Sequence, residues 1–134
     1  MAKREIFSVS TSRKTEMVDI TDQVQASVSG SGVTDGIVVV FVPHTTAGVT
    51  INEGADPAVQ TDIIETLNEI VPWNRGYQHA EGNSPAHIKS SMMGSSVMVI
   101  WENGRLSLGT WQRIFFCEFD GPRRRQVWST VVSG

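Results

Sequence analysis

The segment Ile37-Val-Val-Val-Phe-Val-Pro-His44-Thr-Thr-Ala47 joins an apolar, mostly β-branched run to a short polar sequence. The run over residues 37–42 is apolar at every position, which predicts a central strand covered on both faces. Pro43 has no amide hydrogen to donate to a sheet, so it ends the strand and places His44 at the strand's mouth. The chain then resumes an extended pattern at Ala47–Ile51.

Further strands are predicted on both sides of this segment, where β-forming residues are bounded by turn-forming ones. They are Ile6–Ser10, Met17–Ile20, Ser96–Glu102, Leu106–Leu108, Trp111–Phe119 and Gln126–Val132. Asn103-Gly104 is a favoured two-residue hairpin turn and joins two of these strands. The sheets are therefore expected to be mostly antiparallel.

Two shorter segments predict helices. One covers about Gln23–Ser29 and has a cap at Thr21 or Asp22. The other covers Ala86–Met93 and is opened by a Ser-Pro pair, which repeats the pattern of a capping residue followed by proline. His87 is therefore expected in the first turn of that helix.

A longer helix begins at Asp56-Pro57, where the carboxylate caps and the proline occupies the first turn. Its apolar residues recur at helical spacing up to Pro72, so one of its faces should be core. With about two main helices and mostly antiparallel, β-sandwich-like sheets, residues 1–134 are predicted to form a single α+β domain.

The composition narrows the class of protein. The chain has 134 residues, 40% of them hydrophobic and 19% charged, which is typical of one globular domain. A formal net charge of -3 argues against non-specific nucleic-acid binding. No apolar run is long enough for a membrane helix. Cys117 is the single cysteine, which favours a reducing, cytoplasmic location.

All three histidines lie in polar sequence between apolar runs. His44 follows a strand, whereas His79 and His87 bridge a turn and a helix start. Imidazole binds transition metals and moves protons near neutral pH, so the three rings predict one shared site. Zinc or another divalent transition metal is the expected ligand, and structural histidines are the alternative.

Carboxylates follow the first histidine closely in the sequence. Glu53 is the candidate general base, because no capping role is evident for it, and Asn52 is a candidate either for orienting substrate or for simply turning the chain. Asp56 is more simply explained as a helix cap than as a catalytic group.

Several segments near the histidines carry groups that suit phosphate oxygens. Thr45 and Thr46 offer hydroxyl groups after a strand, and Asn83 precedes a helix N-terminus. Lys89 adds a compact cation, and Arg123, in the Arg123–Arg125 cluster, offers a guanidinium. Each also has a plainer interpretation, as a turn, a cap, a solvated residue or an ion pair with Asp120. Together they predict a small phosphorylated ligand.

The remaining reactive and aromatic side chains are predicted to be structural for the most part. Cys117 lies in an apolar strand and is expected in the core. Trp101, Trp111 and Trp128 lie on strands and are expected to pack, whereas Trp73 is expected to be partly exposed near the second histidine.

Several sequence blocks, in the same order between Ile6 and Val132, resemble the YjbQ family, whose members are described as secondary thiamine-phosphate synthases. The blocks are Pro43-His44-Thr45-Thr46-Ala47, Asn52-Glu53, His79…Gly82-Asn83…Ala86-His87-Ile88-Lys89, Leu108-Gly109-Thr110-Trp111-Gln112 and Glu118-Phe119-Asp120-Gly121-Pro122-Arg123.

The resemblance implies a compact α+β domain that forms a homotrimer with ligand sites near subunit boundaries. The implied reaction joins a hydroxymethylpyrimidine diphosphate to a thiazole phosphate and releases diphosphate, for which magnesium is an alternative metal. In that reaction His44, His79 and His87 would bind metal or phosphate, and Glu53 would act as base or orienting group. There are two alternatives. One is another metal-dependent enzyme, such as a hydrolase, and the other is a non-catalytic trimeric module that binds an anionic metabolite.

Overall fold

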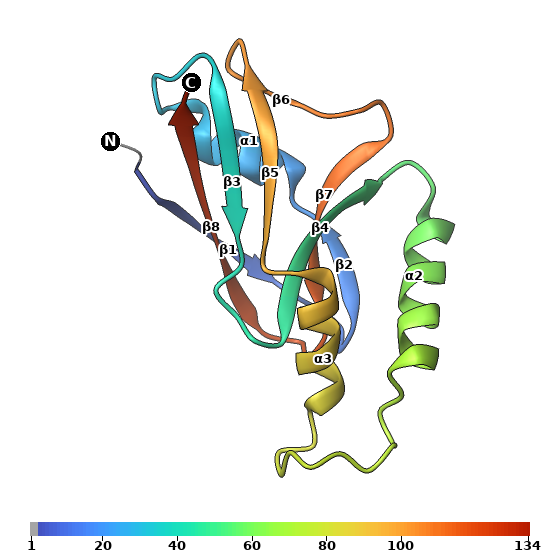
Figure 1. The fold of residues 1–134 in the computed structure, drawn as a ribbon. Helices are drawn as coiled ribbons and strands as arrows, with labels where there is room; N and C mark the ends of the chain where they lie inside the picture. The colour runs from blue at the N-terminus through green and yellow to red at the C-terminus, as the bar shows by residue number, and fades with distance from the viewer. Residues whose placement is uncertain (1–2) are drawn as a thin grey trace.

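Two antiparallel sheets and three helices form a single α+β domain in the computed structural model (Figure 1), which describes residues 3–134. Met1 and Ala2, which the predicted domain includes, lie outside the described residues. The larger sheet has the order β1-β8-β3-β5-β6 and the smaller one the order β2-β7-β4. The prediction of antiparallel, sandwich-like sheets is thereby confirmed.

The elements lie close to the ranges expected from the sequence. The strands are β1 (Glu5–Ser10), β2 (Glu16–Asp19), β3 (Gly36–Phe41), β4 (Ala47–Glu53), β5 (Ser96–Glu102), β6 (Arg105–Ser107), β7 (Gln112–Glu118) and β8 (Arg124–Ser133). The helices are α1 (Thr21–Ser29), α2 (Pro57–Ile70) and α3 (Ser84–Met93).

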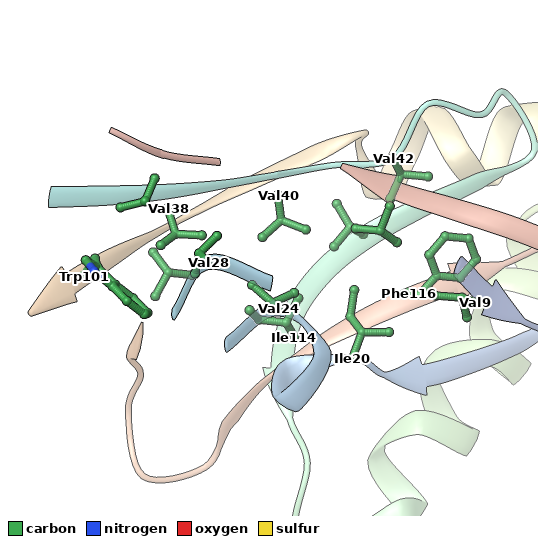
Figure 2. Packing of buried hydrophobic residues seen from close by; sticks show 14 of the residues in the cluster. Val9, Ile20, Val24, Val28, Val38, Val40, Val42, Trp101, Ile114 and Phe116 are labelled. Carbon is green, nitrogen blue, oxygen red and sulfur yellow. The ribbon is translucent and has the colours of Figure 1, made fainter. Parts of the chain in front are cut away.

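The main core lies between the two sheets and α1 (Figure 2). Val38 and Val40 enter it from β3, and Ile114 and Phe116 enter it from β7. A second, smaller cluster lies on the other face of β7, where Phe115 and Cys117 pack beside α3 with the partly buried Leu67 of α2. The expected core position of Cys117 is confirmed, and burial raises the pKa of its thiol to about 12.

Strand β3 is central, because it pairs with both β5 and β8. Only one of its faces is covered, however, and the prediction of burial on both faces is wrong. Val38 and Val40 are fully buried, whereas Ile37 is 45% exposed and Phe41 is 38% exposed. An apolar run marks a strand without showing whether the same chain supplies a cover for each face.

The long helix begins as predicted, since Asp56 Oδ1 accepts from Ala58 N at 2.9 Å and Pro57 occupies the first turn. The expectation that one face of α2 is core is wrong, because no residue of this helix is buried and Ile70 is 61% exposed. Leu67 only packs on the edge of the second cluster. In Figure 1, α2 stands to one side of the sheets.

The caps of the two shorter helices differ from the prediction. Helix α1 begins after Ile20, with no side-chain cap. Thr21 instead accepts from Ile114 N through Oγ1 at 2.8 Å and so fastens the helix start to β7. Helix α3 begins at Ser84 after Asn83, again with no side-chain cap, and His87 lies in its first turn as predicted.

Two tryptophans pack as expected and one does not. Trp101 is buried and donates from Nε1 to Val33 O at 2.8 Å, and Trp128 is partly buried beside Phe41. Trp111 is 63% exposed, so its predicted packing is wrong. In the described part of the chain, no helix is both long and apolar enough to span a membrane.

Candidate functional site

Segments that are far apart in the sequence meet at one end of the domain, around the N-terminus of α3 (Figure 1). They enclose a cavity of about 480 Å³, here termed the central cleft. Its lining residues are Lys14, Thr45, Thr46, Trp73, Glu81, Gly82, Asn83, His87, Asp120 and Arg123. They come from the β1–β2 turn, the β3–β4 loop, the α2–α3 segment, the first turn of α3 and the β7–β8 turn.

Asn83 fastens the start of α3 to the β7–β8 turn. Its Nδ2 donates to Asp120 Oδ2 at 3.0 Å, while its Oδ1 is buried and has no hydrogen-bond partner. Gly82, which precedes it, has a φ of 77°, a conformation that glycine adopts without strain. The cleft therefore contains a buried acceptor that suits a donor group of a ligand or a bound water molecule.

His87 is shared by several cavities. Its ring stands edge-on to that of His79, with the ring centroids 5.3 Å apart, and His79 Nε2 lies 3.8 Å from Glu81 Oε2. His87 also lines a second cavity of about 400 Å³ together with His44 and Thr45. The predicted convergence is thus partial: His79 and His87 meet, and His44 faces an adjoining cavity.

His44 is held by the backbone of β8, because its Nε2 accepts from Gln126 N at 2.9 Å. Burial, reinforced by the positive charge of Arg125, lowers the pKa of His44, which favours the neutral ring. Its Nε2 lone pair is therefore already used. Over residues 3–134, no group of three His, Cys, Asp or Glu side chains is placed to hold a metal ion. A centre of all three histidines does not fit this geometry.

A buried ion pair between Arg125 and Glu118 holds the β3–β4 loop in place through Thr46. Arg125 and Glu118 are both almost fully buried, and Arg125 Nε donates to Glu118 Oε1 at 2.8 Å. Burial alone would raise the pKa of Glu118, but hydrogen bonds from Arg125, Asp120 N and Thr11 outweigh it and lower this pKa. The same guanidinium donates to Thr46 Oγ1 at 2.9 Å.

The two threonines of this loop consequently differ in what they can do. Thr46 is buried and its oxygens accept from Arg125, so it positions the loop. Thr45 is exposed and lines the central cleft, which is where the sequence-based prediction expects it.

Arg123 lies at the mouth of the cleft, half exposed. Its Nη2 is 3.1 Å from Asp120 Oδ2, and its Nε donates to Asp120 O at 2.9 Å. The ion pair that the sequence left open as an alternative is therefore present, and the guanidinium still faces the cleft.

Lys89 does not line the central cleft. It is fully buried, its Nζ donates to Asn68 Oδ1, and the ammonium lies 5.1 Å from the centroid of the Trp73 ring. Burial, followed by repulsion from Lys14, lowers the pKa of Lys89. The ammonium expected to hold phosphate therefore lies behind the side chains that line the cleft, and its role toward a ligand stays a prediction.

Three charged residues of the cleft, Lys14, Glu81 and Asp120, were not among the site residues predicted from the sequence. Lys14 places its Nζ 3.7 Å from the centroid of the Trp73 ring, and Asp120 anchors both Asn83 and Arg123. The β1–β2 turn reaches the β7–β8 turn because Gly121 N donates to Lys14 O at 3.0 Å. No local motif around Lys14 signals this contact.

Glu53 and Asn52 lie at the far end of β4. The strand carries them about 20 Å from the loop that holds His44. Glu53 Oε2 accepts from Asp56 N at 3.1 Å, which is the local role the sequence did not reveal, and Asn52 Oδ1 accepts from Glu53 N at 2.7 Å. The structure does not bring either side chain to the central cleft of the same chain.

The chain is similar to known proteins over nearly its whole length. A family model described as "UPF0047 protein YjbQ-like" matches residues 5–134. A UPF0047 protein of Methanocaldococcus jannaschii is 52% identical over 126 residues, which are 94% of this chain and 91% of the relative. The UPF0047 protein YugU of Bacillus subtilis is 52% identical over 127 residues, 94% of this chain and 96% of the relative.

Solved structures show the same fold. A protein of the YjbQ/UPF0047 family from Clostridium acetobutylicum, described as uncharacterized, superposes with a TM-score of 0.92 at 54% identity and covers 95% of this chain and 98% of its own. A YbjQ-like protein of unknown function from Sulfolobus solfataricus gives a TM-score of 0.94 at 34% identity, with 100% and 99% covered.

Proposed function

The chain belongs to the UPF0047 YjbQ-like family, and from this premise we propose that its central cleft binds a small phosphorylated metabolite and transfers a group from it. The observation that carries the proposal is the convergence of His87, Asn83, Lys14 and Arg123 on one cleft from three separate parts of the chain, namely the start of α3, the β1–β2 turn and the β7–β8 turn. Cations such as Lys14 and Arg123 bind phosphate oxygens, and the free Oδ1 of Asn83 suits a donor group elsewhere on the metabolite.

The reaction proposed is the one that the family resemblance implies. The ring nitrogen of a thiazole phosphate attacks the methylene carbon of a hydroxymethylpyrimidine diphosphate, and the carbon–oxygen bond to diphosphate breaks. This transfer needs little covalent help from the protein, because it depends on aligned reactants and a stabilised leaving group. Lys14 and Arg123 would neutralise the diphosphate, and His87 would donate a hydrogen bond to it.

We also propose that a divalent metal takes part in binding the diphosphate. The neighbouring His79 and His87 rings offer two nitrogen ligands, and magnesium bound mainly through the diphosphate is the alternative. Elemental analysis of the purified protein, and binding of the diphosphate with and without a chelator, test this part. An unchanged affinity in the chelator would remove the metal from the proposal.

We also propose that the chain associates with itself as a homotrimer. The uncovered face of the larger sheet is apolar, with Ile37, Met98 and Ile100 exposed by 45%, 68% and 60% on paired strands. Exposed apolar patches of this kind mark interaction surfaces. A Met98→Asp variant should therefore elute as a smaller species in size-exclusion chromatography with light scattering. An unchanged mass would place the interface elsewhere.

A non-catalytic, metabolite-binding module is the second candidate. The observation that favours it is the position of Glu53, the predicted base, which only a neighbouring copy could bring to the cleft. Turnover distinguishes the two functions, because a binding module would hold both substrates without joining them. A cytoplasmic location remains a prediction that rests on the lone Cys117.

Two neighbouring arginines offer a matched test of the site. Arg123→Gln should weaken binding of the diphosphate substrate at least about tenfold, because a charge-assisted contact is lost. Arg124→Gln is the control, since Arg124 bonds Ser8 and does not line the cleft. His87→Gln should lower turnover. Equal effects of the two arginine variants, or no binding of either substrate by the wild type, would refute the proposed site.

A further inference from the structure

The charged side chains that line the central cleft cancel one another. Lys14 and Arg123 contribute two positive charges, and Glu81 and Asp120 contribute two negative ones. Arg123 and Asp120 also form an ion pair. The lining alone therefore gives the cleft no net charge with which to favour an anion.

Lys89 supplies an unbalanced charge directly behind this lining. Over residues 3–134, no carboxylate lies within ion-pair distance of its ammonium, although the side chain is fully buried. Its hydrogen-bond acceptor is the neutral amide of Asn68, and it lies over the ring of Trp73, which lines the cleft. A buried lysine is costly when it is not paired with an opposite charge, so this residue calls for an explanation.

The ring of Trp73 links the buried charge to the cleft. Lys14 lies 3.7 Å from its centroid on the cleft side, and Lys89 lies 5.1 Å from the same centroid but outside the lining. Two ammonium groups thus share one indole, and neither forms an ion pair among the described residues. The field of Lys89 acts through protein and not through solvent, where it would be screened.

We propose that Lys89 is a specificity-determining residue, whose buried ammonium makes the central cleft prefer doubly charged phosphate groups over singly charged ones without touching them. This inference rests on the proposed binding of a phosphorylated metabolite. Coulomb energy is proportional to ligand charge, so removing Lys89 costs a dianion twice the binding free energy that it costs a monoanion.

The test compares Lys89→Met with the wild type, since methionine preserves much of the buried volume without the charge. The probes are methyl phosphate, a dianion at pH 8, and dimethyl phosphate, a monoanion, with affinities measured by titration calorimetry. We expect the substitution to weaken binding of methyl phosphate about tenfold and of dimethyl phosphate about threefold. A loss that is equal for the two probes would show a merely structural role and overturn the inference.

Lys89→Gln and Lys89→Arg form a matched pair that separates charge from packing. Lys89→Gln keeps a donor for Asn68 Oδ1 but carries no charge, so it should reduce the preference for methyl phosphate as Lys89→Met does, and it keeps the test decisive if that variant fails to fold. Lys89→Arg keeps the charge and should keep the preference. A preference retained in Lys89→Gln, or lost in a folded Lys89→Arg, overturns the inference. If the wild type binds neither probe, the proposed function fails with it.

Discussion

Replacing Arg125 with methionine should destabilise the protein severely at neutral pH. The change leaves the Glu118 carboxylate fully buried without its guanidinium partner, and it removes the hydrogen bonds that Arg125 donates to Thr46. Breaking a buried ion pair from one side costs about 3–5 kcal/mol. A domain of this size has a total stability of about 5–15 kcal/mol, so the loss is a large fraction of it.

Urea unfolding followed by tryptophan fluorescence measures this cost. With a typical slope of about 2 kcal/mol per molar urea, the unfolding midpoint should fall by roughly 2 M at pH 7. Arg124→Met is the surface control and should change stability by less than about 0.5 kcal/mol. The double variant Arg125→Met/Glu118→Gln should recover most of the loss, because the unpaired buried charge is then gone.

The pH dependence of the free energy of unfolding provides a second, independent test of the Arg125–Glu118 pair. In the wild type the pKa of Glu118 lies below its usual value, so the stability that it contributes is present above the unfolded-state pKa and is lost as the pH falls through the folded-state pKa. In Arg125→Met, burial dominates and raises this pKa, so the variant should gain stability from this group as the pH falls from 7 towards 5. A loss under about 1 kcal/mol at pH 7, or an acid dependence parallel to that of the wild type, would refute the reasoning.

Three further predictions concern residues outside the cleft. Asp56→Ala removes the cap of α2 and should cost about 1 kcal/mol in thermal unfolding without changing ligand affinity. Cys117 should react with a thiol reagent only at the rate of unfolding, since burial raises its pKa to about 12; fast labelling of the native protein would contradict this. Gly48→Ala should lower the melting temperature by several degrees, because a Cβ there would lie 2.6 Å from Gly94 O and push α3 away from β4.

Local features of the fold were predictable from the sequence because their causes are local. The Asp56 cap and the Asn103-Gly104 turn depend on a few neighbouring residues, and the structure shows the bond of the cap and the positive φ angles of the turn. The coverage of β3 and α2 is a different kind of property. Periodicity shows which face is apolar, but whether that face is covered depends on distant segments or on other copies of the chain.

The part of the candidate site that lies in polar loops beside the histidines could be predicted from the sequence. Thr45, Asn83, His87 and Arg123 were all named from the sequence and all line the central cleft, while their binding roles stay predictions. Glu53 did not follow, because closeness in sequence was treated as closeness in space. A strand of extended residues separates it from His44 and carries it to the opposite end of β4.

The position of Lys14 shows why the missing part of the site could not be found by motif. It reaches the cleft because β2 pairs with β7, and because the turns at the ends of these strands bond through Gly121 N and Lys14 O. The buried pair of Arg125 and Glu118 holds the same end of the domain together. Thr11, which follows β1, donates from Oγ1 to the Glu118 carboxylate at 2.8 Å. The residues that stabilise this end of the domain are thus the ones that align the cleft. Arg125→Met should for this reason lower phosphate affinity even under conditions in which the variant remains folded.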